Sequence, residues 1–236
     1  MILVAGGDSF IWGSELQDSP NGGPHGYSHE TFTALLAKEY GFDYVCAAYP
    51  GNANSAISRM AISACQRIKQ DKFLIVNWTY PQRAEFRVDD KWVSINSWHT
   101  ELKEFSKSYF KHVGNSEYYE IYSIFKEILF LQQYCEINKI PYLFTTADNH
   151  FYQHENYFCR QDEDIDNLYN NINWNNWYLF PAGTEANETT IPRGFYQWAI
   201  ENKYNMGQDG HPLEDAHKDA TKLIKEKFDE LVKKYC

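Results

Sequence analysis

The 236-residue sequence contains no long apolar run. A membrane-spanning helix requires roughly 18 consecutive apolar residues, and no segment approaches that length. Lysine and arginine form no cluster, and the formal net charge is −10. Because nucleic acids and anionic membranes attract positively charged surfaces, we expect neither as a partner.

Cysteine is sparse and irregularly placed. The five cysteines are an odd number and form no CxxC pair, a pattern typical of reduced thiols rather than of a disulfide framework. The chain begins with a short apolar run and lacks the charged segment and long apolar stretch of a secretory leader. We therefore expect a cytoplasmic or otherwise non-secreted protein. The sequence leaves open a bacterial or a viral origin, and also the oligomeric state.

No proline- or serine-rich linker, charge block or internal repeat divides the chain, so residues 1–236 are interpreted as a single domain. Short apolar runs predict buried strands at residues 2–5, 44–47, 73–78 and 141–146. Apolar residues at helical spacing predict helices at residues 28–40, 54–69, 116–138, 194–203 and 213–235. This alternation predicts an α/β fold with a central parallel sheet and helices on both faces. Residues 85–95 alternate and turn at Asp89-Asp90, which predicts a small added hairpin.

Residues 149–192 form a long irregular stretch that is rich in asparagine and aromatic side chains. A loop region this long inside a compact domain is usually a lid or a substrate wall. The aromatic residues at 169–178 could stack on a sugar or could pack the lid, and the sequence does not choose. His150 and His154 have the spacing of ligands on a helix, but the segment is predicted to be a loop without an acidic ligand motif. We expect no metal and no cofactor.

Three polar segments fall at the predicted ends of strands or just before the last helix. They are residues 6–10, residues 50–54 and residues 209–212. In open parallel sheets, active sites lie beyond the carboxyl ends of the strands. A serine hydroxyl becomes an effective nucleophile when a base removes its proton and an acid orients that base. Ser9 on its glycine-rich turn is the expected nucleophile, His211 the base and Asp209 the acid.

The same segments supply candidate donors for an oxyanion, each typically worth about 3 kcal/mol in the transition state. The backbone N–H groups of Ser9 and Gly51 and the side-chain amide of Asn54 are the expected donors, with Thr79 as a weaker alternative. Glycine at position 51 permits a backbone conformation that directs its N–H into the site. Gly51 and Asn54 could instead simply cap the following helix.

Each of these segments has a known counterpart. Gly-Asp-Ser-Phe at residues 7–10 continues into Trp-Gly-x-Glu-Leu at 12–16, Tyr-Pro-Gly-Asn-Ala-Asn stands at 49–54, and Asp-Gly-His-Pro stands at 209–212 with His217 further on. In this order they resemble the first, glycine-containing and last blocks of the SGNH (GDSL-like) hydrolase family. The resemblance implies a three-layer α/β/α sandwich and ester or acyl chemistry on a Ser-His-Asp triad.

The chain departs from that family's pattern at two places. The family usually places its acid three residues before the histidine, where this chain has Gln208, with Asp209 one residue closer. The family's Gly-x-Asn-Asp block after the third strand is replaced by Asn-Trp-Thr-Tyr at residues 77–80. Asn54 is therefore the expected source of the third oxyanion donor.

The resulting hypothesis is a serine esterase that forms an acyl-enzyme intermediate. Its expected partner is a small-molecule or carbohydrate ester, and an O-acetyl group on a carbohydrate is the first substrate to test. Two alternatives stay open at this point. The same triad could transfer an acetyl group to a sugar hydroxyl, or the chain could be a non-catalytic glycan-binding module that kept the fold.

Overall fold

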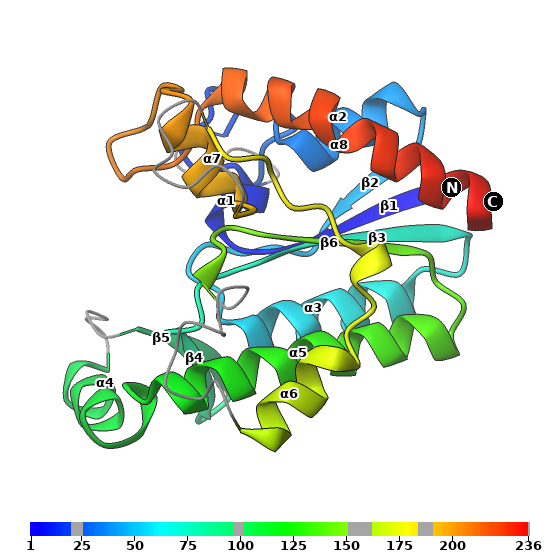
Figure 1. The fold of residues 1–236 in the computed structure, drawn as a ribbon. Helices are drawn as coiled ribbons and strands as arrows, with labels where there is room; N and C mark the ends of the chain where they lie inside the picture. Colours follow the sequence, from blue (N-terminus) through cyan, green and yellow to red (C-terminus); the bar gives the residue numbers. More distant parts are fainter. Residues whose placement is uncertain (20–25, 97–101, 151–161, 184–190, 236) are drawn as a thin grey trace.

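Four parallel strands form the centre of the protein, in a computed structural model that describes residues 1–19, 26–96, 102–150, 162–183 and 191–235. Their order across the sheet is β2-β1-β3-β6 (Figure 1). The strands are β1 (Ile2–Gly6), β2 (Asp43–Cys46), β3 (Lys72–Trp78) and β6 (Tyr142–Thr146). All four occupy the predicted positions to within one or two residues.

Helices cover both faces of this sheet, as the three-layer expectation requires (Figure 1). One face carries α1 (Ser9–Trp12), α2 (Phe32–Glu39), α7 (Phe195–Glu201) and α8 (Glu214–Tyr235). The other carries α3 (Asn54–Arg67), α5 (Glu117–Ile137) and α6 (Glu163–Asn170). Within the described ranges, no helix has the length and apolar character needed to cross a membrane.

The two layers follow from the alternation of side chains along each strand, since neighbouring strand residues point to opposite faces. In β3, Phe73 and Ile75 pack into the cluster beneath α2 and α8, whereas Leu74 and Val76 pack into the cluster beneath α3 and α5. All four side chains are fully buried. The sheet is therefore apolar on both sides, which is typical of parallel sheets.

The predicted hairpin is present as β4 (Ala84–Val88) and β5 (Lys91–Ile95), an antiparallel pair separate from the main sheet. It lies against α3, at the end of the molecule that also holds α1 (Figure 1). The sequence pattern did not predict the next two elements, α4 (Lys103–Tyr109) and the π-helical turn η1 (Phe110–Gly114).

Residues 149–192, which were expected to be irregular, contain the helix α6 in the part that the structure describes. Asp162 caps α6 by accepting hydrogen bonds from the backbone N–H groups of Asp164 and Ile165, at 3.0 and 3.1 Å. A short 3-10 turn, η3 (Trp174–Asn176), follows. The aromatic residues at 169–178 pack mainly with α5 and β6 in the core. Residues 151–161, which include His154, and residues 184–190 lie outside the described residues.

Truncating Phe228 should test how far α8 depends on the aromatic cluster beneath it. The Phe228 ring is fully buried and lies 4.7 Å from the ring of Phe73 and 5.0 Å from that of Tyr40, measured between centroids. We expect Phe228→Ala to lower the free energy of unfolding by roughly 3–5 kcal/mol, because the cavity removes both transfer energy and contacts. Leu223→Ala on the same helix is the control, since Leu223 is 38% exposed. Urea denaturation that gives equal losses for the two variants would contradict this assignment.

Candidate active site

The turn that follows β1 places Ser9 at the start of α1. Gly7 lies so close to Ile11 that an added Cβ would be 2.5 Å from its Cγ1, so this turn requires glycine. Asp8 caps α1 by accepting a hydrogen bond from the N–H of Phe10 at 3.1 Å. The short helix ends at Gly13, whose φ is +79°. Ser9 is largely buried, with 8% of the residue exposed.

Asp8 is completely buried beside Ser9, and its charge is compensated from the loop after β3. Its Oδ2 accepts hydrogen bonds from Thr79 Oγ1 at 2.6 Å and from Arg83 Nη1 at 3.0 Å. A buried carboxylate without such partners would cost several kcal/mol. Thr79, the weaker candidate for an oxyanion donor, is thus engaged with Asp8.

The turn after β2 is joined to the Ser9 turn by several hydrogen bonds. Asn52 Nδ2 donates to the carbonyl of Gly7 at 3.0 Å, and the N–H of Tyr49 donates to the same oxygen at 3.4 Å. Arg83 Nη1 also donates to the carbonyl of Asn52 at 3.2 Å. Arg83 therefore holds both turns that carry candidate oxyanion donors, because it contacts the residue before Ser9 and the residue after Gly51.

Gly51 stands at the exposed tip of that second turn with a φ of +78°, a region that favours glycine. Within the described part of the chain, neither the N–H of Gly51 nor that of Ser9 is used in a hydrogen bond. Both groups therefore keep the donor capacity that the sequence analysis expected of them.

The side-chain amide of Asn54 has a different task from the one expected. Its Nδ2 donates to the carbonyls of Thr79 and Tyr80 at 3.2 and 3.3 Å, and its Oδ1 accepts the N–H of Thr79 at 3.0 Å. Both amide protons are used, and the side chain is buried. Asn54 fastens the start of α3 to the end of β3 and is not brought to the site as a free oxyanion donor.

His211 lies in the loop before α8, and the carboxylate that it contacts is that of Glu15. The distance between His211 Nδ1 and Glu15 Oε2 is 2.6 Å. A nitrogen and an ionised carboxylate this close require a proton between them, which places the hydrogen on Nδ1 and leaves Nε2 as the basic nitrogen. This is the arrangement that a histidine base needs.

Glu15 is held firmly in this position. Its carboxylate also accepts the backbone N–H of Asp209, at 3.0 and 3.1 Å to its two oxygens, and the N–H of His211 at 3.3 Å. Desolvation raises the pKa of Glu15, but these hydrogen bonds and the His211 ring together outweigh it, so the pKa lies below its usual value. Glu15 has a φ of +69°, a strained conformation of the kind found at functional sites.

Asp209 does not orient the histidine as the sequence analysis expected. Its backbone N–H, rather than its carboxylate, takes part in the contact, and the residue is exposed. The reason is local geometry: residues 207–210 form a tight turn in which the N–H of Gly210 donates to the carbonyl of Gly207 at 3.1 Å. Gly207 approaches Glu15 so closely that an added Cβ would lie 2.3 Å from the carboxylate carbon.

The observed link between the Ser9 turn and His211 is a ring contact made by Phe10. The His211 ring packs edge-on against the Phe10 ring at 5.6 Å, and Phe10 directly follows Ser9. Ser9 Oγ has no hydrogen-bond partner among the described residues. Catalytic hydrogen bonds are often long in ligand-free structures and tighten when substrate binds.

Comparisons with known proteins show a similarity of fold. No protein-family model matches the sequence, and no curated protein matches it significantly. Among solved structures, a carbohydrate esterase family 2 enzyme with a carbohydrate-binding domain from Corynascus thermopiles (Myceliophthora fergusii) is similar, with a TM-score of 0.57 and 10% identity over 98% of this chain. The acetyl xylan esterase Est2A from Butyrivibrio proteoclasticus is similar with a TM-score of 0.50 and 12% identity over 97% of this chain. This chain spans 66% and 64% of those two longer proteins.

Two residues of the site were not assigned a role from the sequence. Glu15 belongs to the Trp-Gly-x-Glu-Leu segment. Its position two residues after Gly13, where α1 ends, is the sequence feature that could have indicated a role at the site. The second residue is Arg83, which forms an ion pair with Asp8, while the neighbouring Glu85 pairs with Arg59.

The contact between Glu15 and His211 can be tested without any assumption about activity. In protein with ¹⁵N-labelled histidine, the Nδ1 proton of His211 should resonate strongly downfield, because it is held by a carboxylate. Glu15→Gln should abolish that resonance, and Asp209→Asn should retain it. His211→Asn identifies the signal among the eight histidines. Loss of the signal in Asp209→Asn with retention in Glu15→Gln would reverse the assignment.

Proposed function

We propose that the protein is a serine esterase in which Ser9 is the nucleophile, His211 the base and Glu15 the orienting acid. The observation that carries this proposal is the 2.6 Å contact between Glu15 and His211 Nδ1, with the His211 ring packed against the residue that follows Ser9. The contact fixes the tautomer whose Nε2 can accept a proton. The fold shared with two solved carbohydrate esterases supports the same conclusion.

The reaction proceeds in two halves. In the first, Ser9 Oγ attacks the ester carbonyl carbon while His211 Nε2 takes the hydroxyl proton. The tetrahedral intermediate then collapses, the bond to the leaving alcohol breaks, and His211 returns the proton to that oxygen. In the second half, water attacks the acyl-enzyme with His211 again as base, and the carboxylic acid leaves as Ser9 regains its proton.

Negative charge that develops on the carbonyl oxygen meets the N–H groups of Ser9 and Gly51. Each such donor is typically worth about 3 kcal/mol because it is already oriented before charge appears. The buried carboxylate of Asp8 would oppose an oxyanion beside it, but Arg83 compensates its charge at 3.0 Å. The ion pair therefore lets Asp8 shape the Ser9 turn without repelling the intermediate.

An O-acetyl group on a carbohydrate is the proposed substrate. The cation that the structure describes beside the Ser9 turn, Arg83, is already paired with Asp8, so it does not favour an acidic acyl chain. Both similar structures are named as enzymes that act on carbohydrate esters. A small neutral acyl group is consistent with these features.

Replacing the nucleophile should abolish turnover. We expect Ser9→Ala to reduce kcat/KM for p-nitrophenyl acetate at least about 10³-fold, since the remaining donors cannot replace covalent catalysis. Ser108→Ala on α4 is the matched control and should leave the rate unchanged, because Ser108 is exposed and lies outside the site. A fluorophosphonate probe should label wild-type protein at Ser9. Absence of both labelling and turnover in folded protein would instead favour a non-catalytic glycan-binding module.

The two candidate acids can be separated by kinetics. Glu15→Gln should lower kcat by roughly 10²–10⁴-fold with little change in KM, because the amide no longer fixes the reactive tautomer. Asp209→Asn should stay within about threefold of wild type, since only its backbone contacts Glu15. A large loss of kcat in Asp209→Asn alone would show that the exposed carboxylate, rather than Glu15, is the acid.

A further inference from the structure

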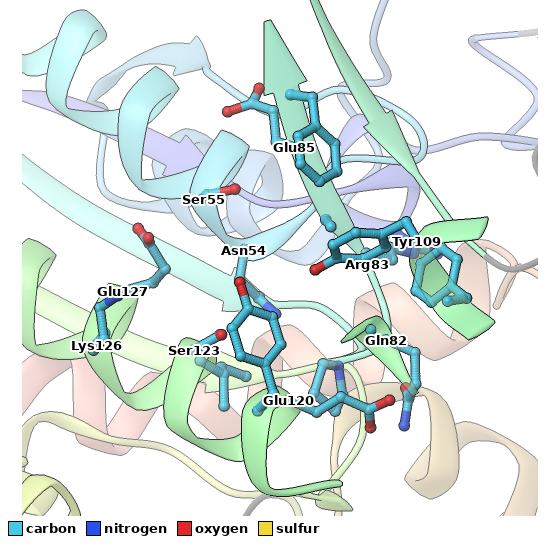
Figure 2. A pocket seen from close by; sticks show the side chains of 17 residues that line it. Asn54, Ser55, Gln82, Arg83, Glu85, Tyr109, Glu120, Ser123, Lys126 and Glu127 are labelled. Atoms are coloured by element: carbon cyan, nitrogen blue, oxygen red, sulfur yellow. The ribbon is translucent and has the colours of Figure 1, made fainter. Parts of the chain in front are cut away.

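A pocket of about 210 Å³ lies beside the Ser9 turn and is not used by the proposed triad. Its walls come from the start of α3, the loop after β3, the hairpin strand β4, the end of α4 and one face of α5 (Figure 2). Arg83 and Asn54 line it. Because Arg83 also contacts Asp8, and Asn54 fastens the loop after β3, the pocket shares its inner wall with the framework of the Ser9 turn.

The wall formed by α5 is polar where an inward helix face is normally apolar. Glu120, Ser123 and Glu127 are spaced three and four residues apart, so they lie on one face of the helix, and Figure 2 shows them together at the pocket. Glu120 is only 8% exposed. Burying polar groups costs free energy unless hydrogen bonds compensate it, so this face is suited to a ligand that forms hydrogen bonds.

Most charged side chains around the pocket have partners within the protein, and the ammonium of Lys126, which also lines it, lies 5.4 Å from the centroid of the Tyr122 ring. Glu85 forms two contacts with Arg59, at 2.5 and 3.2 Å, and Arg83 pairs with Asp8. Glu127 accepts a hydrogen bond from the hydroxyl of Ser58. Burial raises the pKa of Glu120 to about 7, so near neutral pH this carboxyl is protonated in a large fraction of molecules. Because side chains of both signs line the pocket and most of them are already paired, we expect a neutral ligand rather than a strongly charged one.

A neutral ligand rich in hydroxyl groups fits this lining. Hydroxyl groups both donate and accept, and the pocket offers the carboxyl oxygens of Glu120 and Glu127 together with the hydroxyls of Ser55 and Ser123. Phe86 and Tyr109 add aromatic surface. Pockets for drug-sized ligands usually measure about 300–1,000 Å³, so the smaller volume here suits a single ring.

A second, more open groove of about 480 Å³ continues from the pocket. The two share Ser55, Glu85 and Glu127 as lining residues. The groove reaches Trp92 and Phe130, which are 47% and 59% exposed. Exposed aromatic side chains along a polar groove offer further contact surface for a ligand longer than one ring.

We propose that the pocket binds one neutral sugar residue and that the adjoining groove binds further residues of the same oligosaccharide. One part of this assignment rests on the proposed esterase function: the bound glycan carries the ester group that Ser9 attacks. The hairpin β4–β5 then acts as one wall of the glycan site, and α5 as the other.

Binding can be measured separately from turnover by using the Ser9→Ala protein. Isothermal titration with cellohexaose, xylohexaose and mannohexaose should show binding of at least one of these neutral oligosaccharides. Ser123→Phe, added to Ser9→Ala, fills the pocket and should weaken that binding at least about tenfold. Gln133→Phe is the matched control, because Gln133 is exposed on the same helix and lies outside the pocket and groove.

A second variant keeps the proposal testable if the first one does not fold. If Ser123→Phe unfolds, Ser55→Leu narrows the pocket from the α3 side and should have the same effect. Binding of none of the three oligosaccharides, equal binding by the filled and control variants, or tighter binding of an oligogalacturonate would each overturn the proposal. Glycan binding without turnover of acetylated substrates by wild type would refute the esterase function and leave the glycan site standing.

Discussion

One carboxylate joins the two ends of the folded chain. Glu15, six residues after the proposed nucleophile, accepts hydrogen bonds from the Asp209 and His211 backbone and from the His211 ring. These contacts bridge 196 residues of sequence. Without them the loop before α8 would lose its main polar attachment to the Ser9 turn, and the imidazole would lose both its orientation and its tautomer. The positive φ of Glu15 and the glycine at position 207, which leaves room for the Glu15 carboxylate, both allow this contact.

A second polar centre organises the opposite side of the same turn. Arg83 lies on a loop that has no glycine-asparagine block, and it connects the turns after β1 and β2 through Asp8 and Asn52. Asn54 closes the arrangement by fastening α3 to the end of β3. The shape of the candidate oxyanion site is thus stabilised by a buried ion pair and by the hydrogen bonds of the Asn54 side-chain amide. The same arginine forms part of the wall of the proposed glycan pocket.

The sequence was sufficient for the architecture because the apolar periodicity is strong. Leu3, Phe73 and Leu143 are buried on one face of the sheet, and the alternation that places them there is visible in the strands themselves. The serine and histidine were also predictable, since each stands in a distinctive short segment. Asp209 was chosen because it is close to His211 in sequence, but in the turn at residues 207–210 only its backbone N–H contacts Glu15. A contact made across 196 residues by a residue with positive φ leaves no such local signature. The core packing of the aromatic residues near Trp177 was missed because composition alone does not distinguish a lid from a helix docked on α5.

The distance in sequence between Glu15 and His211 also affects when chemistry can start. Chains are synthesised from the N-terminus, so the glycine-rich turn with its serine leaves the ribosome long before the imidazole has been added. A nascent chain stalled before position 211 holds Ser9 without the base proposed for it. In the proposed mechanism, reactivity therefore begins only after the loop before α8 has reached Glu15, and interrupted translation products are unreactive.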